Sequence, residues 1–155
     1  MDQQIVANES VRSGILDIEA KMKEVPGAFI GDNDVCPLKH SFADGVYVRE
    51  IFIPKNTLIV GKLHRHSHPN FILSGDVSVL TEEGPRRIKG PCSMISPAGT
   101  KRVVYTHEDT TWITVHVTKE RDLDKIEKEI IAENYEALTK EEFNMIEAFA
   151  NEVSK

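Results

Sequence analysis

The spacing of apolar residues divides the chain into three zones with different periods. In the first zone, apolar residues recur every three or four positions, at Val11, Ile15, Ile18, Met22 and Val25. This spacing places them on one face of a helix, because 3.6 residues make one turn. Pro26 and Gly27 then disfavour continuation of the helix. We therefore predict an N-terminal helical extension within residues 1–30.

The second zone, from Val35 to Val117, has an apolar period close to two. Residues 46–53 show it clearly, since Val46 and Val48 alternate with Tyr47 and Arg49. Comparable stretches, separated by glycine and proline turn signals, follow at residues 57–63, 70–74, 77–81, 87–89, 93–96, 102–105 and 111–117. Many short strands without intervening helices are typical of an all-β sandwich or barrel. We predict such a β-barrel over residues 35–118.

The third zone returns to a helical period. Leu123, Ile126, Ile130 and Ile131 share one predicted helical face. Thr139 with Glu142 forms a capping box for a last helix. Short helices gain most of their stability from packing, so residues 119–155 are predicted to pack on the barrel or on a partner subunit. The apolar stripes of the terminal helices favour a homodimer.

Length and charge narrow the class of protein. A chain of 155 residues fits one domain, and its net charge of −6 argues against a nucleic-acid or polybasic membrane surface. No window approaches the run of about 18 apolar residues that a membrane helix needs. Cys36 and Cys92 lie far apart and form no CxxC pair, which fits a reducing compartment. With no signal-peptide pattern at the N-terminus, we expect a cytoplasmic protein.

Three of the six histidines lie within five residues, as His64-Arg65-His66-Ser67-His68. Residues two apart on a strand share a face, so the three imidazoles are expected side by side, together with Asn70. Alternating imidazoles can bind a metal ion or a ligand. The alternative is a solvated edge strand or a histidine-rich turn.

Two segments carry a family resemblance. Residues 61–77, with the alternating histidines and Gly75 after an apolar strand, resemble the first cupin motif, and Pro97-Ala98-Gly99 followed by Arg102 resembles the second. The resemblance spans residues 35–117. It implies a cupin (jelly-roll) β-barrel as an all-β core, flanked here by α-helical extensions at both termini. It also implies a divalent Fe, Mn, Ni or Zn ion on His64, His66 and His68.

The match to these motifs is incomplete. His68 stands where the cupin pattern has a Glu ligand, and Arg102 stands where it has a histidine. Arginine stays protonated and cannot give a lone pair to a metal. A complete three-His, one-Glu site is therefore absent, which leaves open a three-histidine site and a pocket without metal.

Arg102, if it points into the barrel, suits a carboxylate or phosphate group. The alternative is a surface arginine that pairs with Glu82, Glu83 or Glu108. Further candidate ligand-binding residues share the strands of the predicted barrel, and they are Asn70, Tyr105, Trp112 and His116. His116 could complete the histidine cluster across the barrel, but a hydrogen-bonded core residue is the favoured interpretation, and Tyr105 and Trp112 can be core aromatics.

Two functions follow from these residues. The first is a metal-dependent cupin that acts on a small anionic molecule. The second is a non-catalytic cupin that binds or sequesters a small metabolite or sugar without turnover. The abbreviated motif also resembles cupin-like proteins carried by bacterial viruses. No nucleophile elbow, P-loop or Rossmann fingerprint is present, so the sequence leaves open whether the protein is an enzyme.

Overall fold

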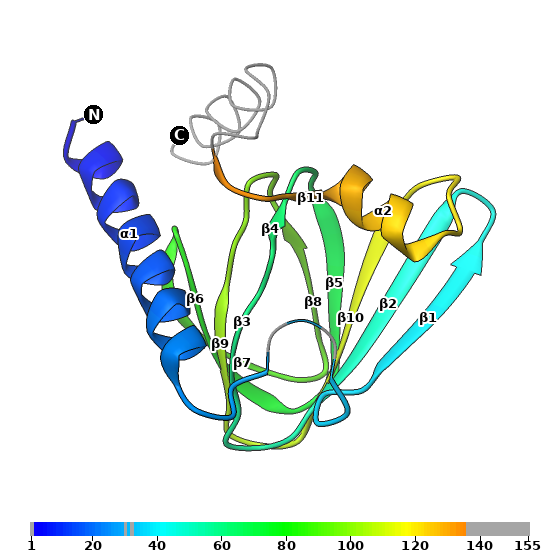
Figure 1. Cartoon of the computed structure of the whole chain (residues 1–155), viewed down its shortest axis with the longest axis horizontal. Coiled ribbons are helices and arrows are strands. Elements are labelled where there is room, and N and C mark those ends of the chain that lie inside the picture. Colours follow the sequence, from blue (N-terminus) through cyan, green and yellow to red (C-terminus); the bar gives the residue numbers. More distant parts are fainter. Residues whose placement is uncertain (1, 30, 32, 136–155) are drawn as a thin grey trace.

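The computed structural model describes residues 2–29, 31 and 33–135 (Figure 1). It has two helices, α1 (Asp2–Glu24) and α2 (Leu123–Ile130). The strands are β1 (Leu38–Ala43), β2 (Val46–Ile53), β3 (Leu58–Val60), β4 (Leu63–His64), β5 (His68–Ser74), β6 (Asp76–Thr81), β7 (Gly84–Lys89), β8 (Cys92–Ser96), β9 (Val103–Thr106), β10 (Thr110–Val117) and β11 (Ile131–Ala132). Neither helix has the length and apolar character needed to cross a membrane.

Two antiparallel sheets face each other. The larger has the strand order β1-β2-β10-β5-β8 and the smaller β3-β9-β6-β7, while β4 and β11 form a separate pair. Neighbours in each sheet are mostly distant in sequence, as in a jelly roll. Within the described residues the sheets form a sandwich and do not close into one continuous barrel. Figure 1 shows α1 along the four-stranded sheet and α2 above the ends of β2 and β10.

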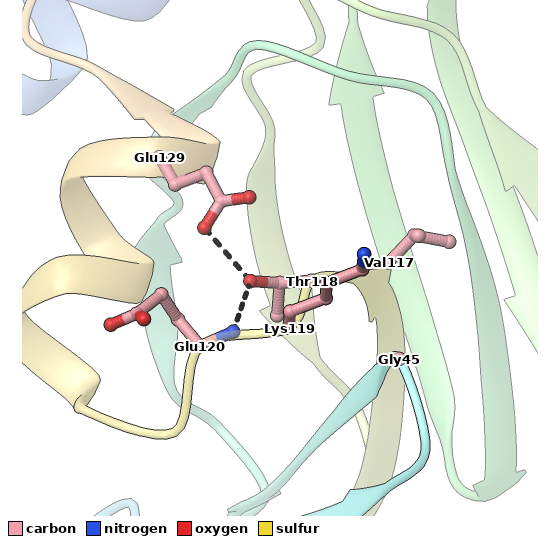
Figure 2. A pocket seen from close by; sticks show the side chains of 6 residues that line it. All are labelled: Gly45, Val117, Thr118, Lys119, Glu120 and Glu129. Atoms are coloured by element: carbon pink, nitrogen blue, oxygen red, sulfur yellow. Dashed lines mark hydrogen bonds between the residues drawn. The ribbon is translucent and has the colours of Figure 1, made fainter.

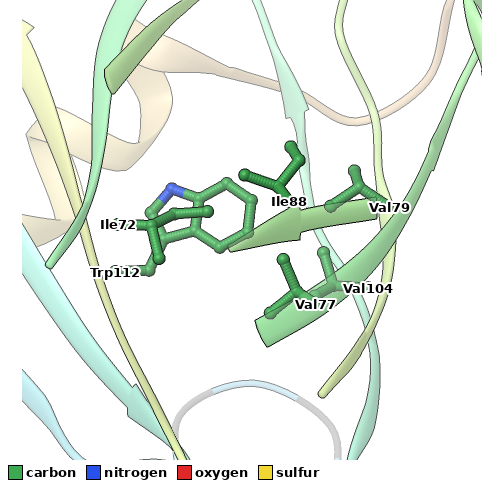
Figure 3. Close-up of a cluster of buried hydrophobic side chains, with 6 residues drawn as sticks. All are labelled: Ile72, Val77, Val79, Ile88, Val104 and Trp112. Atoms are coloured by element: carbon green, nitrogen blue, oxygen red, sulfur yellow. The ribbon is translucent and has the colours of Figure 1, made fainter. Parts of the chain in front are cut away.

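The apolar core lies between the two sheets. Ile72 and Trp112 come from the larger sheet, and Val77, Val79, Ile88 and Val104 come from the smaller one (Figure 3). These side chains alternate with exposed or half-exposed neighbours along their strands, for example in β10. The period of two along the sequence therefore has its physical cause in this one-sided burial.

The terminal helices dock on different parts of the sandwich. α1, predicted from its period, buries Ile15 completely and is held by ion pairs from Arg12 to Glu82 and from Lys101 to Glu19. α2 begins at the cap Asp122, whose side chain accepts a hydrogen bond from the amide of Lys125. The helix predicted from Thr139 onward lies outside the described residues.

One prediction for the third zone is wrong. Ile131 does not extend the helical face of Ile126 and Ile130, because α2 ends at Ile130 and Ile131 begins strand β11. There Ile131 pairs with His64, and Ala132 pairs with Leu63. The short strand β4 therefore pairs with a strand that lies nearly 70 residues later in the chain.

Candidate functional site: an imidazole cluster beside Arg102

Three histidines from different strands meet between the sheets. The ring centroids of His64 and His68 are 4.3 Å apart, those of His68 and His116 are 4.9 Å apart, and those of His64 and His116 are 5.6 Å apart. His64 comes from β4, His68 from β5 and His116 from β10. We call these three residues the imidazole cluster. His68 and His116 are buried, and His64 is half-buried.

The cluster differs from the predicted row of histidines. A continuous strand would place His64, His66 and His68 on one face, but the chain bends at Arg65 and His66 between β4 and β5. His66 is exposed as a result, and in the described residues no ring contact joins it to the cluster. Its backbone oxygen accepts a hydrogen bond from Nδ1 of His68 at 3.1 Å. His116, from the far end of the barrel sequence, lies where His66 was expected.

Arg102 lies beside the cluster in a hydrogen-bonded network. Its Nη2 donates to Oγ of Ser96 at 2.8 Å and lies 3.1 Å from Nε2 of His68. Oγ of Ser96 also accepts from Nδ2 of Asn70 at 2.8 Å, and Oδ1 of Asn70 accepts from the indole of Trp112 at 3.0 Å. The guanidinium carbon lies 5.3 Å from the Trp112 ring centroid. Buried polar residues thus fix the cation in place.

The hydrogen bonds of His68 define its tautomer. Nδ1 faces a carbonyl oxygen and therefore carries the proton, while Nε2 faces a guanidinium N–H and therefore accepts. This arrangement suits the neutral imidazole only, because a second proton on Nε2 would point at the arginine.

The pKa values of the cluster are lowered. Burial is the largest cause for each residue, lowering the pKa of His68 to about 4 and that of His116 to about 3, and placing that of His64 well below its ordinary value. After burial, the neighbouring His68 lowers the pKa values of His64 and His116 most, and Arg102 and Arg49 lower both further. The three imidazoles are therefore neutral at pH 7. Burial also lowers the pKa of Arg102 to about 10, which leaves it charged.

Sequence reasoning missed three members of this site. Arg49 acts on His64 and His116 from β2, Ser96 joins Arg102 to Asn70, and Tyr47 stacks on His116 with ring centroids 5.9 Å apart. The sequence does indicate an inward position for Arg49 and Tyr47, because they lie on the same face of the strand as the inward Ile51 and Ile53. Nothing in the sequence marks Ser96.

One sequence candidate lies elsewhere. Tyr105 is on the outward side of the four-stranded sheet, where its hydroxyl donates to Oδ1 of Asn56 at 3.2 Å. The structure thus brings together His64, His68, Asn70, Arg102, Trp112 and His116, and separates Tyr105 and His66 from them. The alternative, a surface Arg102 that pairs with glutamates, is wrong. The guanidinium of Arg102 instead forms hydrogen bonds with Ser96 and His68.

The residues as arranged do not fit a metal ion. Neutral imidazoles are good ligands, and Nδ1 of His64 is buried with no hydrogen-bond partner among the described residues. However, the lone pair of His68 Nε2 that would bind a metal already faces the Arg102 guanidinium. Among the described residues, no group of three or more His, Cys, Asp or Glu side chains is arranged to hold an ion. We therefore derive no chemistry through a metal.

A separate pocket lies on the surface where β10 leads to α2 (Figure 2). Gly45, Val117, Thr118, Lys119, Glu120 and Glu129 line it. Thr118 Oγ1 donates to Glu129 at 2.8 Å and accepts from the amide of Glu120 at 3.1 Å. These polar groups satisfy one another and lie apart from the imidazole cluster, so we give this pocket no functional role.

Comparison with solved structures identifies the fold. Ectoine synthase from P. lautus matches 63% of this chain and 74% of its own at a TM-score of 0.52 and 11% identity. KdgF from Halomonas sp. matches 62% of this chain and 90% of its own at a TM-score of 0.50 and 15% identity. Both are cupin superfamily proteins. This chain has the cupin fold.

The cupin fold confirms the expected architecture, apart from the open edges between the sheets. A cupin superfamily protein from Desulfitobacterium hafniense also matches, at a TM-score of 0.47 and 8% identity over 59% of this chain and 84% of its own. No protein-family model matches the sequence, and no curated protein matches it. At these identities the likeness concerns the fold alone, because one fold supports many functions.

Proposed function

We propose that this cupin binds a small molecule carrying a carboxylate or phosphate group at Arg102 and the imidazole cluster. One observation carries the proposal: the guanidinium of Arg102 is held against the imidazole cluster, with Nη2 3.1 Å from Nε2 of His68. Arg102 and Arg49 also lower the pKa values of His64 and His116, after burial and the neighbouring His68. In the described part of the chain neither arginine forms an ion pair. A net-acidic protein that keeps cations between its sheets with no carboxylate partner among the described residues is suited to an anionic guest.

Arg102 has the free donors that such a guest needs. A guanidinium carries five N–H bonds, and the hydrogen bonds to Ser96 and His68 both come from Nη2. Within the part of the chain that the structure describes, Nε and Nη1 of this half-buried side chain have no hydrogen-bond partner and remain for a ligand. An edge of this shape binds a carboxylate through two parallel hydrogen bonds, which a lysine cannot reproduce.

The lowered pKa values favour binding over acid–base catalysis. A general base works best when its pKa lies near the working pH, and each unit away costs about tenfold in the protonation balance. His68 and His116, at about 4 and about 3, lie far below neutral pH. As neutral groups they serve as hydrogen-bond partners for polar atoms of the guest.

A metal-dependent reaction is the competing proposal. The buried and unpartnered Nδ1 of His64 favours it, because such a nitrogen lacks the partner that buried polar atoms normally have. Ectoine synthase, an enzyme by name, shares the fold, but fold alone does not select a reaction. Metal analysis of protein purified without an affinity tag separates the two, since an ion in a 1:1 ratio that is lost in His64→Ala would support this competitor.

Ligand binding is tested with simple anions. We expect calorimetry and thermal unfolding to detect binding of succinate, benzoate or inorganic phosphate, and little binding of the uncharged amides succinamide and benzamide. Arg102→Gln should raise the dissociation constant of the anion at least about tenfold, as expected for loss of a charge-assisted bidentate contact. Arg87→Gln is the matched control, because Arg87 is exposed and pairs with Asp76 on the other sheet.

Three results would contradict the proposal. They are a wild-type protein that none of these anions stabilises, equal binding of anions and amides, and unchanged anion binding in Arg102→Gln. Each leaves the fold assignment intact, since that rests on the strands and their order.

A further inference from the structure

The outward side of the five-stranded sheet is apolar across its three central strands. In β10 the buried residues Trp112, Thr114 and His116 alternate with outward ones, and β2 and β5 show the same alternation. The outward positions of these strands are Val46, Val48, Glu50 and Phe52 in β2, Thr111, Ile113, Val115 and Val117 in β10, and Pro69, Phe71 and Leu73 in β5. All of them except Glu50 and Thr111 are apolar. We call this set, with Ile95 of the neighbouring β8, the outer apolar face.

The strand registers make the outer apolar face continuous. Val48 pairs with Val115, and Ile113 pairs with Phe71, so apolar side chains adjoin across three strands. Pro69 pairs with Ile95, which extends the face to the edge strand β8. Residues paired across strands have Cβ atoms only about 5 Å apart. The result is one patch and not a scatter of single apolar residues.

This patch stays open in the described part of the protein. Val117 is 86% exposed, Ile95 66%, Leu73 52%, Phe71 40% and Phe52 38%. α1 lies against β6 of the other sheet, and the buried residues of α2 pack on Tyr47, which faces inward (Figure 1). Neither helix therefore covers it.

The open area is of the size that protein association uses. These five side chains alone leave on the order of 500 Å² exposed, near the upper end for the largest apolar patch of a monomer. Their half-exposed neighbours bring the face toward the roughly 800 Å² per partner of a standard interface. A surface of this area and composition favours a protein partner.

We infer that the outer apolar face is where a second copy of this chain docks. The face is a broad sheet, and two such sheets pack face to face at about 10 Å with their side chains interdigitated. A second copy presents the same surface, which a two-fold axis brings into register with itself. The single charge at the centre, Glu50, lies opposite Lys39 of β1, so two acidic chains can approach here without a concentrated negative patch.

Other partners match the face less well. A membrane surface calls for several basic side chains around the apolar ones, and Lys39 is the only Lys or Arg among the outward residues of β1, β2, β10 and β5. An amphipathic helix needs a groove, whereas the face is the side of a sheet. This interface also differs from one made by the terminal helices.

Analytical ultracentrifugation tests the inference on the full chain. The wild-type protein should sediment at twice the chain mass at about 100 µM, and the dimer should persist in 1 M NaCl because its contacts are apolar. Ile95→Lys combined with Leu73→Lys should raise the dissociation constant at least about 100-fold, since each copy would bury two unpaired charges. Leu58→Lys, a similarly exposed leucine on the other sheet, is the matched control and should leave the dimer intact.

Circular dichroism and urea unfolding check that the variants fold. If the double variant loses its fold, Ile95→Lys alone replaces it, because Ile95 is mostly exposed and contributes little to the monomer. A wild-type monomer at every concentration would overturn the inference. A dimer that survives these lysine substitutions, or one that dissociates equally in Leu58→Lys, would place the interface elsewhere and overturn it as well.

Discussion

Nη2 of Arg102 lies 3.1 Å from Nε2 of His68, so a fixed cation faces the nitrogen that would receive a second proton. This contact makes protonation of His68 unfavourable, in addition to the cost of burial that is the largest cause of its low pKa of about 4. We expect long-range ¹H–¹⁵N NMR to show His68 as the neutral Nδ1–H tautomer throughout pH 5–8. In Arg102→Gln the pKa should rise but stay below its ordinary value, because burial remains. A His68 that titrates near its ordinary value in the wild type would contradict the structure.

Stability should fall as the solution is made acidic. The pKa values of His68 and His116 are lowered to about 4 and about 3 in the folded protein. Below pH 6.5, the ordinary pKa, these histidines therefore bind protons in the unfolded state but not in the folded state. Their contribution is complete above about pH 6.5 and is lost as the pH falls toward the folded values. Each group then costs up to about 1.4 kcal/mol per pH unit.

Urea unfolding at pH 7, 6 and 5 measures this dependence before most carboxylates titrate. His116→Gln should flatten the profile, while His66→Gln, at an exposed position, should not. A free energy of unfolding that is constant from pH 7 to pH 5 would show that the cluster is not buried in neutral form.

Gly75 should tolerate no side chain. Its φ is +124°, and an added Cβ would lie 2.2 Å from Oγ1 and 2.8 Å from Cα of Thr110. Gly84 also has a positive φ, of +101°, but has open space around it. Gly84→Ala therefore reports backbone strain alone, about 1 kcal/mol or more, and Gly75→Ala should cost about 1–3 kcal/mol beyond it. Equal losses in urea unfolding would mean that Gly75 and Thr110 are not this close.

The docking of α1 should depend more on Glu19 than on its partner. Nζ of the buried Lys101 donates to Glu19 at 3.1 Å. Glu19→Gln leaves a buried ammonium without its counter-charge, whereas Lys101→Met removes that charge and keeps an apolar stem. We expect Glu19→Gln to lower the free energy of unfolding by about 1–3 kcal/mol and Lys101→Met by less. Glu24→Gln, exposed on the same helix, is the control, and the reverse order of the first two would show that Lys101 is not desolvated.

Local patterns predict the parts of this fold that local forces decide. The bounds predicted for residues 46–53 agree with β2, and the helical period up to Val25 agrees with α1, because one-sided burial and turn residues determine both. Strand β11 has no such signal: Ile131 fits a helical face as well as a strand, and its pairing with His64 is a tertiary contact. For a similar reason, strand β1 is not predicted. Its polar residues Lys39, His40 and Ser41 form a strand by pairing with β2, which is also a tertiary contact.

The candidate site is predictable only in part. The motif resemblance places Arg102 at an inward position, and strand parity places Asn70 with the histidines and Trp112 with His116. The bend at Arg65 and His66 turns His66 away from the cluster, and His116 takes its place. The alternating histidines do not predict this bend, because they contain no residue that requires a turn there. Ser96, which bridges Arg102 and Asn70, becomes visible only when β5 and β8 are paired.

The pairing of β4 with β11 has a consequence for how much of the chain the site requires. The amide of Arg65 donates to the oxygen of Ile130 at 2.8 Å, and Nε of Arg65 donates to that of Ile131 at 3.1 Å. A shortened protein that stops after Val117 would keep every strand of both large sheets and the backbone hydrogen bonds of His64 to Thr100 and Gly99. It would lose both of these hydrogen bonds of the neighbouring Arg65 to Ile130 and Ile131. The shortest piece that keeps β4 paired along its other edge as well therefore runs through Ala132.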